Sequence, residues 1–376
     1  PTGIVMNESD ALGKKYRGLL LSADAGRNTI FGYMPHIKNS GYDLGKRTNF
    51  ITSLKSDTAL YVWNDTAANK QHEKWFRPSD VAIGTDGTIY VADWYDPIVG
   101  GHAMEDTLGI GKIYRIAPRN KKLTAPKYDF NSVAGQIEAL KSPAINVRNT
   151  AFQLLQKQGD AVYEQVAALL QDDNSFYRAR AVWLLSKLGD KGKTKLKKLL
   201  QSEDEEMRIT SFRASRQTGE NILPLCEIMA NDKSPFVRRE AAVALRDTML
   251  EKKKNILLTI AKQYDGKDRW YIEATGSAME KDAAFWYDTL KTVFAQNNPA
   301  EWNDVMKDFA WRLHPPNAVN DFAQIISSEK TDSAARKKML TGLAFIKTKE
   351  AAMAMVNYTK STDKTLAEDA AYWASF

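Results

Sequence analysis

The sequence predicts an α+β multidomain chain, in which a partial β-propeller of two to three blades is followed by an α-helical repeat solenoid. Three observations support this prediction. Short β-rich runs separated by turn residues fill residues 1–117. An arginine then recurs every thirty residues, and apolar residues at helical spacing continue toward the end of the chain. We therefore expect propeller blades in 1–120, helical repeats in 130–250 and looser helical repeats in 251–376.

The first segment contains runs rich in β-branched and aromatic residues, which are typical of short strands. We expect strands at 18–23, 29–33, 49–52, 80–83, 88–92 and 112–116. Asp86 and Gly87 lie between two of these runs, and an Asp-Gly pair is a strong signal for a hairpin turn. The strands between 80 and 116 would then make most of one four-stranded propeller blade.

The length of this segment limits what it can form. A blade takes roughly 40–50 residues and a closed propeller needs at least four blades. The segment can therefore supply two to three blades but cannot close a propeller. Because an open sheet exposes unpaired strand edges, we expect it to associate with another molecule or to pack its edge on the solenoid.

The second segment contains an internal repeat. The repeated arginines, and the small residues three positions after them, are Arg148, Arg178, Arg208 and Arg238, with Ala151, Ala181, Ser211 and Ala241. Gly159, Gly189 and Gly219 recur with the same period. Glycine at the end of a helix fits a left-handed cap, so each period predicts a helix pair. One pair cannot bury its apolar stripe alone, so neighbouring pairs must stack. The pattern resembles HEAT repeats of the short kind that contains a Val-Arg motif.

The recurring arginines allow two interpretations. They could form a structural ladder, in which each guanidinium pairs with an acidic or carbonyl group of the adjoining repeat. They could instead line the concave face and bind a ligand. We favour the ladder.

The third segment remains helical, with a looser register. Trp286, Trp302 and Trp311 lie in helical stretches, where we expect them to be core residues. Pro315 and Pro316 break a helix, because proline cannot continue the hydrogen-bond pattern.

Composition excludes several classes of function. The net charge of +7 is spread over both halves, whereas a nucleic-acid binder usually concentrates its charge. The basic run 191–198 is a solvated helix face in one interpretation and a site for an acidic surface in the other. No apolar run reaches the roughly 18 residues of a membrane span. The single cysteine, Cys226, makes no intrachain disulfide or CxxC site, and we expect it in the core. Because the chain begins at Pro1, we expect it to be a piece of a longer protein.

Several strings in the first segment carry a family likeness. Residues 1–3, 15–28 and 76–80, with the Asp-Gly hairpin, resemble the last blades of quinoprotein glucose/sorbosone dehydrogenases. The string from Tyr90 to His102, followed by HEAT repeats, resembles the membrane-bound dehydrogenase family of Bacteroidetes and Planctomycetes, also called PVC-type haem-binding proteins. In that family a propeller precedes HEAT repeats, and a cytochrome c domain with a CxxCH motif follows.

The resemblance implies a parent protein that oxidises a sugar or an alcohol in the periplasm or cell envelope. It implies PQQ or Ca²⁺ as a cofactor of the parent, and haem c in a domain that this chain lacks, since it has no CxxCH motif. The early blades, which hold much of the catalytic machinery in related quinoproteins, are also missing. The isolated chain is therefore expected to be inactive.

Two groups of polar residues are candidates for chemistry. Asp93 and Asp96 with His102 follow a blade strand, where they could bind Ca²⁺ or act as acid and base, with Trp94 beside them. The alternative is that the two aspartates tie down turns and His102 is an ordinary loop residue.

The second group is Asp24, Arg27 and Asn28, which could hold a polar ligand or form a salt-bridged turn. Arg77 and Asp80 are a weaker pair, for which we favour a structural role. Three histidines that stand alone in the sequence are expected to be ordinary residues: His36, His72 and His314. No GxGxxG, P-loop, HExxH or GxSxG motif is present.

Two functions remain open. The chain could be the C-terminal part of a dehydrogenase, with its solenoid linking the propeller to a haem domain. It could instead be a non-catalytic interaction module, whose solenoid binds a protein partner or a neighbouring domain and whose β segment caps that solenoid. We favour the dehydrogenase as the origin of the chain and the interaction module as its own behaviour.

Overall fold

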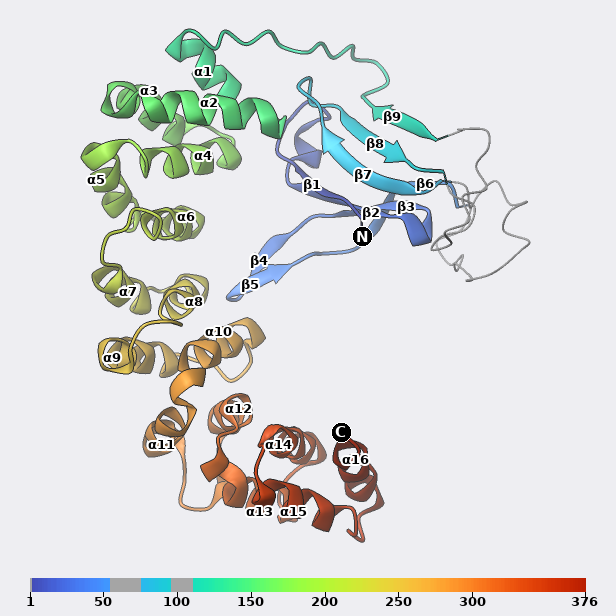
Figure 1. Ribbon diagram of the computed structural model, residues 1–376, viewed down its shortest axis with the longest axis vertical. Helices are drawn as coiled ribbons and strands as arrows, with labels where there is room; N and C mark the ends of the chain where they lie inside the picture. Colours follow the sequence, from blue (N-terminus) through green and yellow to red (C-terminus); the bar gives the residue numbers. More distant parts are fainter. Residues whose placement is uncertain (1, 55–75, 96–110) are drawn as a thin grey trace. The chain divides into compact units, whose positions relative to one another are not determined.

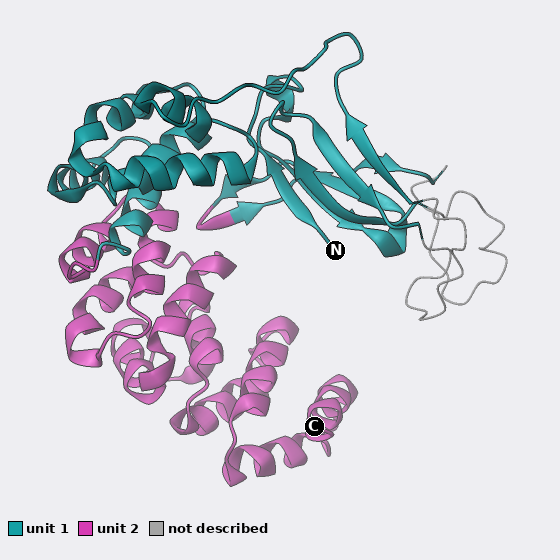
Figure 2. Ribbon diagram, turned by 45° about the horizontal axis from the view of Figure 1, so that its top comes forward, with its two compact units in different colours: residues 1–38, 42–218 teal, residues 39–41, 219–376 magenta. Residues whose placement is uncertain are grey.

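The computed structural model describes residues 2–54, 76–95 and 111–376. Strands extend to Ile116, and helices follow from Val133 to Ala374 (Figure 1). The chain divides into two compact units (Figure 2). Unit 1 comprises 1–38 and 42–218, and unit 2 comprises 39–41 and 219–376. Each unit is described by itself.

The first sheet of unit 1 is an antiparallel meander of four strands in the order β1-β2-β3-β6. Its strands are β1 (Ile4–Asn7), β2 (Leu19–Asp24), β3 (Thr29–Tyr33) and β6 (Thr48–Thr52). Between β3 and β6 the chain forms a two-stranded hairpin, β4 (His36–Lys38) and β5 (Gly41–Asp43). The sequence analysis found the runs of β2, β3 and β6 but missed β1 and the hairpin.

The second sheet is a three-stranded antiparallel meander in the order β7-β8-β9. Its strands are β7 (Pro78–Ile83), β8 (Ile89–Asp93) and β9 (Lys112–Ile116), as expected from the sequence. The Asp-Gly hairpin is confirmed: Gly87 has a φ of 77°, and Asp86 Oδ1 accepts a hydrogen bond from the Thr88 N–H at 3.0 Å. Leu21 and Ile30 of the first sheet share one fully buried core with residues of β7 and β8.

The helices of unit 1 form the predicted pairs. They are α1 (Val133–Leu140), α2 (Ile145–Lys157), α3 (Tyr163–Ala168), α4 (Ser175–Leu185), α5 (Gly189–Leu199) and α6 (Glu205–Ser215). The small residues three positions after each arginine are all 0% exposed: Ala151, Ala181, Ser211 and, in unit 2, Ala241. Positive φ angles of 59°, 80° and 77° at Gly159, Gly189 and Gly219 confirm the left-handed residues at the helix ends.

The arginine ladder is confirmed as a structural device. Each recurring arginine donates from Nη1 to a backbone carbonyl in the turn that closes the preceding repeat. The pairs are Arg148 with Pro143 (3.0 Å), Arg178 with Asp172 (3.0 Å), Arg208 with Ser202 (2.7 Å) and Arg238 with Asp232 (2.7 Å). The guanidinium thereby gives a hydrogen-bond partner to a carbonyl of the turn between two helices, outside any helix hydrogen-bond pattern. Consecutive repeats are tied together in the same way four times.

Unit 2 is helical apart from residues 39–41. Its helices are α7 (Leu223–Ala230), α8 (Pro235–Ala244), α9 (Leu250–Ala261), α10 (Arg269–Met279), α11 (Ala283–Phe294), α12 (Asp304–Leu313), α13 (Val319–Ser327), α14 (Ser333–Phe345), α15 (Lys349–Tyr358) and α16 (Lys364–Ala374). Trp286 and Trp302 are core residues, 0% and 2% exposed, as expected, whereas Trp311 is only half-buried. Residues 39–41 belong to this unit, where the Ser40 N–H donates to Asp268 Oδ2 at 2.8 Å.

Three further expectations are tested by the structure. Cys226 is fully buried, as predicted. The helix α12 ends before Pro315, with His314 in a left-handed conformation at φ 30°. No helix in the described part of the chain is long and apolar enough to cross a membrane.

Candidate interaction site on the inner helices of unit 1

Asp93 ends β8, where its carboxylate holds a local turn. Its Oδ1 accepts hydrogen bonds from the backbone N–H groups of Arg77 at 2.8 Å and Tyr95 at 3.0 Å. Its Oδ2 accepts from the Tyr114 hydroxyl at 3.4 Å, and burial together with this carboxylate raises the pKa of Tyr114. These contacts are those of a turn-forming residue, and the catalytic role expected for Asp93 stays a prediction.

Asn28 and Arg77, which the sequence analysis assigned to separate groups, lie in one network between the two sheets. Asn28 takes a left-handed conformation, with φ at 53°, and its Nδ2 donates to the Phe76 carbonyl at 2.8 Å. Arg77 is only 1% exposed, and its Nη1 donates to the Ala25 carbonyl at 2.9 Å. Buried polar groups need such partners, so these side chains join the turn after β2 to the start of β7.

The other candidates contribute less to this network. Asp24 accepts a hydrogen bond from the Arg27 N–H at 3.0 Å and so caps a single helical turn, while Arg27 itself is exposed. Asp80 is exposed and bonds the neighbouring backbone at Val81. Trp94 is 58% exposed.

Three of the sequence candidates, Asp96, His102 and His72, lie outside the described residues. Within 2–54, 76–95 and 111–376, no group of three or more His, Cys, Asp or Glu residues is arranged to hold a metal ion. The Ca²⁺ site at Asp93 and Asp96 therefore stays a prediction, as do the roles inferred for PQQ and haem.

A different set of side chains joins the β segment to the solenoid, at the loop between β1 and β2. The loop is shaped by Asn7, which is 0% exposed and whose Nδ2 donates to the Tyr16 carbonyl at 2.8 Å. Ser9 adds a second local bond, because its Oγ accepts from the Ala11 N–H at 3.1 Å. The loop is thereby held so that Glu8 and Arg17 reach the helices.

Glu8 is the centre of this junction. Its carboxylate pairs with Arg180 of α4, and it lies 3.2 Å from Arg148 Nη1 of α2. Its backbone carbonyl accepts a hydrogen bond from Asn174 Nδ2 at 3.0 Å. The side chains of Glu8, Arg148 and Arg180 are 17%, 22% and 12% exposed. We call Glu8, Arg148, Asn174 and Arg180 the junction cluster.

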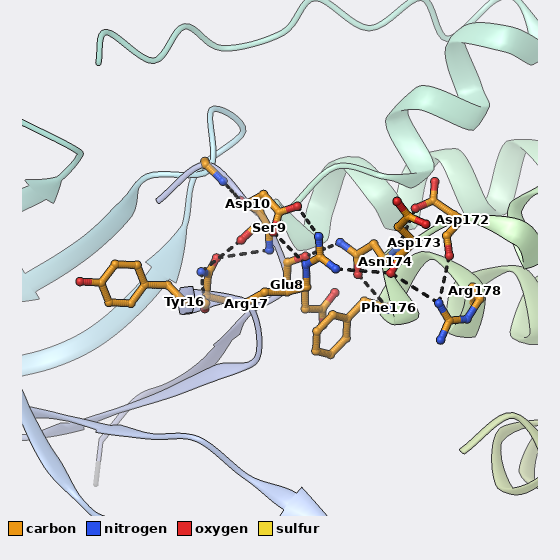
Figure 3. Close-up of polar contacts among 12 residues, drawn as sticks. Glu8, Ser9, Asp10, Tyr16, Arg17, Asp172, Asp173, Asn174, Phe176 and Arg178 are labelled. Atoms are coloured by element: carbon orange, nitrogen blue, oxygen red, sulfur yellow. Dashed lines mark hydrogen bonds and ion pairs between the residues drawn. The ribbon is translucent and has the colours of Figure 1, made fainter. Parts of the chain in front are cut away.

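Figure 3 shows Glu8 and Asn174 of the junction cluster together with a second contact between the same loop and the helices, made by Arg17. Arg17 forms a two-pronged ion pair with Asp10, and its Nη1 donates to the Asp173 carbonyl at 3.4 Å. Asn174 is the N-cap of α4, since its Oδ1 accepts from the Phe176 N–H at 3.0 Å. The same asparagine thus starts a repeat helix with its oxygen and holds the β1–β2 loop with its nitrogen.

The junction places α2 and α4 on the side of unit 1 that faces the strands, with α3 and α5 on the opposite side (Figure 1). We refer to α2, α4 and α6 as the inner row. A groove of about 430 Å³ lies between α2 and α4, lined by Leu140, Ile145, Asn146, Arg148, Asn149, Phe152, Arg180 and Trp183. A second one, of about 170 Å³, lies between α4 and α6.

Electrostatics in the junction cluster are only partly balanced. Burial lowers the pKa of Arg148, and the nearby Arg180 lowers it further, while Glu8 acts in the opposite direction. Two guanidinium groups therefore share one carboxylate in a partly desolvated place. Such an arrangement suits the binding of negative charge.

The sequence analysis missed the junction cluster. It identified Arg148 as a ladder residue, but Glu8 is separated from Arg180 by 172 positions, and no local pattern signals that contact. The prediction that the β segment would pack on the solenoid is correct for the described residues. The contact is made by the β1–β2 loop, whereas we expected a strand edge to make it.

The helices of unit 1 match a known repeat family. A family model of HEAT repeats matches residues 133–216. No curated protein matches the chain. None of the comparisons below names a dehydrogenase, so that resemblance stays a prediction.

Three solved structures illustrate the similarity. An engineered protein from the Northeast Structural Genomics Consortium has 16% identity over 65% of this chain and 77% of its own, with a TM-score of 0.30. A designed armadillo repeat protein in complex with the peptide (KR)4 has 15% identity over 65% of this chain and 98% of its own, with a TM-score of 0.21. The CpcE–CpcF complex of phycocyanin lyase from Nostoc sp. PCC7120 has 16% identity over 69% of this chain and 99% of its own, with a TM-score of 0.19. The match to the family model alone shows HEAT repeats at 133–216, which follow the small antiparallel sheets in the chain.

Proposed function

We propose that the chain is a protein-interaction scaffold, in which the inner row of HEAT helices binds a protein partner and the β segment caps one end of that row. The observation that carries this proposal is the junction cluster: the inner row already binds a peptide segment, the loop at Glu8, through side chains of two repeats. Solenoids use extended surfaces of this kind for recognition.

The finer interpretation of the β segment is that its two sheets are neighbouring propeller blades. It is supported by the meander order of both sheets and by the core they share. The origin in a dehydrogenase, with a cell-envelope location, rests on the sequence resemblance alone. The turn contacts of Asp93 and the structural contacts of Asn28 and Arg77 favour scaffolding over catalysis in this chain.

Site-specific photo-crosslinking in the native host tests the scaffold function. A photoreactive amino acid would replace Asn149, which is exposed on α2 of the inner row, or Gln165, which is exposed on α3 of the opposite side. We expect a discrete protein adduct from position 149 and none from position 165. Equal adducts from both positions, or none from either, would contradict the proposal.

A further inference from the structure

The groove between α2 and α4 has an apolar floor that is open to solvent. Phe152 and Trp183 are half-buried, and Ile145, in the first turn of α2, is 71% exposed. A volume of about 430 Å³ lies within the usual range of small binding sites. It has room for one or two large apolar side chains.

One edge of the groove is cationic. Arg180 donates from Nη1 to the Leu140 and Ser142 carbonyls at 2.8 and 3.1 Å, and it meets Glu8 through Nη2. Arg148 meets both the Pro143 carbonyl and Glu8 through Nη1. No acidic side chain lines the groove in the described residues, so the edge keeps the charge of one unbalanced guanidinium.

Two amides also line the groove, Asn146 and Asn149, both exposed on α2. Amide side chains can donate to and accept from an extended peptide backbone. Glu8 gives an example of this recognition inside the molecule. There an acidic side chain sits on two arginines while an asparagine amide holds the same residue's carbonyl.

We infer that the α2–α4 groove binds a short acidic and apolar segment of a protein partner. An apolar side chain of the partner packs on Ile145, Phe152 and Trp183, and a flanking carboxylate faces Arg148. Charge complementarity selects this occupant over a basic one, because arginines bind carboxylates strongly where solvent is partly excluded. The inference rests on the proposed scaffold function and names the class of partner.

The probe is a fluorescein-labelled peptide with the sequence Gly-Glu-Leu-Phe-Glu-Gly, titrated into the full chain and followed by fluorescence anisotropy. A second peptide carries lysine in place of both glutamates. Octanoate serves as a competitor, because a fatty acid has the same carboxylate-and-chain chemistry. The variant Ile145→Asp removes the apolar contact at an exposed position. Its matched control is Met249→Asp, because Met249 is an apolar residue outside the groove with a similar exposure, 62% against 71%.

A charge series at Asn149 gives an independent readout. We expect the acidic peptide to bind at least 10-fold more tightly than the lysine peptide, and Ile145→Asp to weaken it about 10-fold, while Met249→Asp leaves it unchanged. Asn149→Lys should tighten binding and Asn149→Glu should weaken it. Circular dichroism of each variant confirms that it is folded.

Equal binding of the two peptides, or no effect of Ile145→Asp, would overturn the inference, and so would displacement of the acidic peptide by octanoate at an equal concentration. A photo-adduct at position 149 without binding of the acidic peptide would overturn the partner class while leaving the scaffold function standing. Absence of both the photo-adduct and the binding of the acidic peptide would contradict the scaffold function as well.

Discussion

Replacing Glu8 by glutamine removes the one carboxylate of the junction cluster and keeps its size. The change leaves Arg148 and Arg180 close together without a counter-charge, at 22% and 12% exposure. Breaking a fully buried ion pair from one side costs about 3–5 kcal/mol. Because all three side chains keep some contact with solvent, we expect about 2 kcal/mol for Glu8→Gln.

Hydrogen exchange measured by mass spectrometry provides the local readout. A loss of about 2 kcal/mol in the free energy of local opening speeds amide exchange about 30-fold wherever that opening breaks the junction. We expect this faster exchange in the amides of β1 and β2. Glu138→Gln is the matched control, because Glu138 is 66% exposed and its ion pair with Lys141 lies at the surface. That variant should cost less than about 0.5 kcal/mol. If the two variants behaved alike, the junction cluster would not hold the β segment on the helices.

Three further predictions concern stability. Ser211→Ala should stabilise the protein by about 1 kcal/mol in urea unfolding, because the buried Ser211 hydroxyl has no hydrogen-bond partner among the described residues. Ser215→Ala should destabilise it by a similar amount, since the Ser215 hydroxyl donates to the Ser211 carbonyl, and the opposite order would refute this assignment. Gly159→Ala should lower stability by about 1 kcal/mol through backbone strain alone, because φ is 59° and an added Cβ would meet no atom of the described residues. Gly159→Asn should cost less, because asparagine tolerates the left-handed conformation better than alanine does. Equal costs for the two variants would contradict a left-handed cap. Hydrogen bonding to Arg17 lowers the pKa of Asp10 below its ordinary value of 3.8. The ion pair's contribution to folding stability is therefore fully present above pH 3.8, and it is lost as the pH falls through the lower pKa of the folded state. Asp10→Asn should remove this part of the pH dependence of stability, and an acid titration that is unchanged in the variant would count against it.

The repeat could be predicted from the sequence because its signals are local and periodic. The positive φ of Gly189, the burial of Ala181 and the carbonyl contacts of Arg178 all follow from one helix pair and its preceding turn. Strands with strong β-branched runs were also found. β1 was missed because Ile4–Asn7 is a short sheet-edge strand whose first residue is 64% exposed.

The candidate site could not be predicted, because its contacts are non-local. Asn28 and Arg77 were recognised as polar residues near strands, but only the packing of two sheets brings them together. Glu8 meets Arg180 because a loop of the first sheet reaches a helix of the second repeat. Asn174 gave a partial signal, since an asparagine before a helix is a common N-cap, but its second role depends on the loop that it holds.

The central claim is that the inner row of unit 1 is where a protein partner binds. Hydrogen exchange of the full chain, measured with and without the partner captured through position 149, tests it most directly. We predict slower exchange in α2 and α4, with α3 and α5 unchanged. Protection confined to α3 and α5, or to the strands, would contradict the claim.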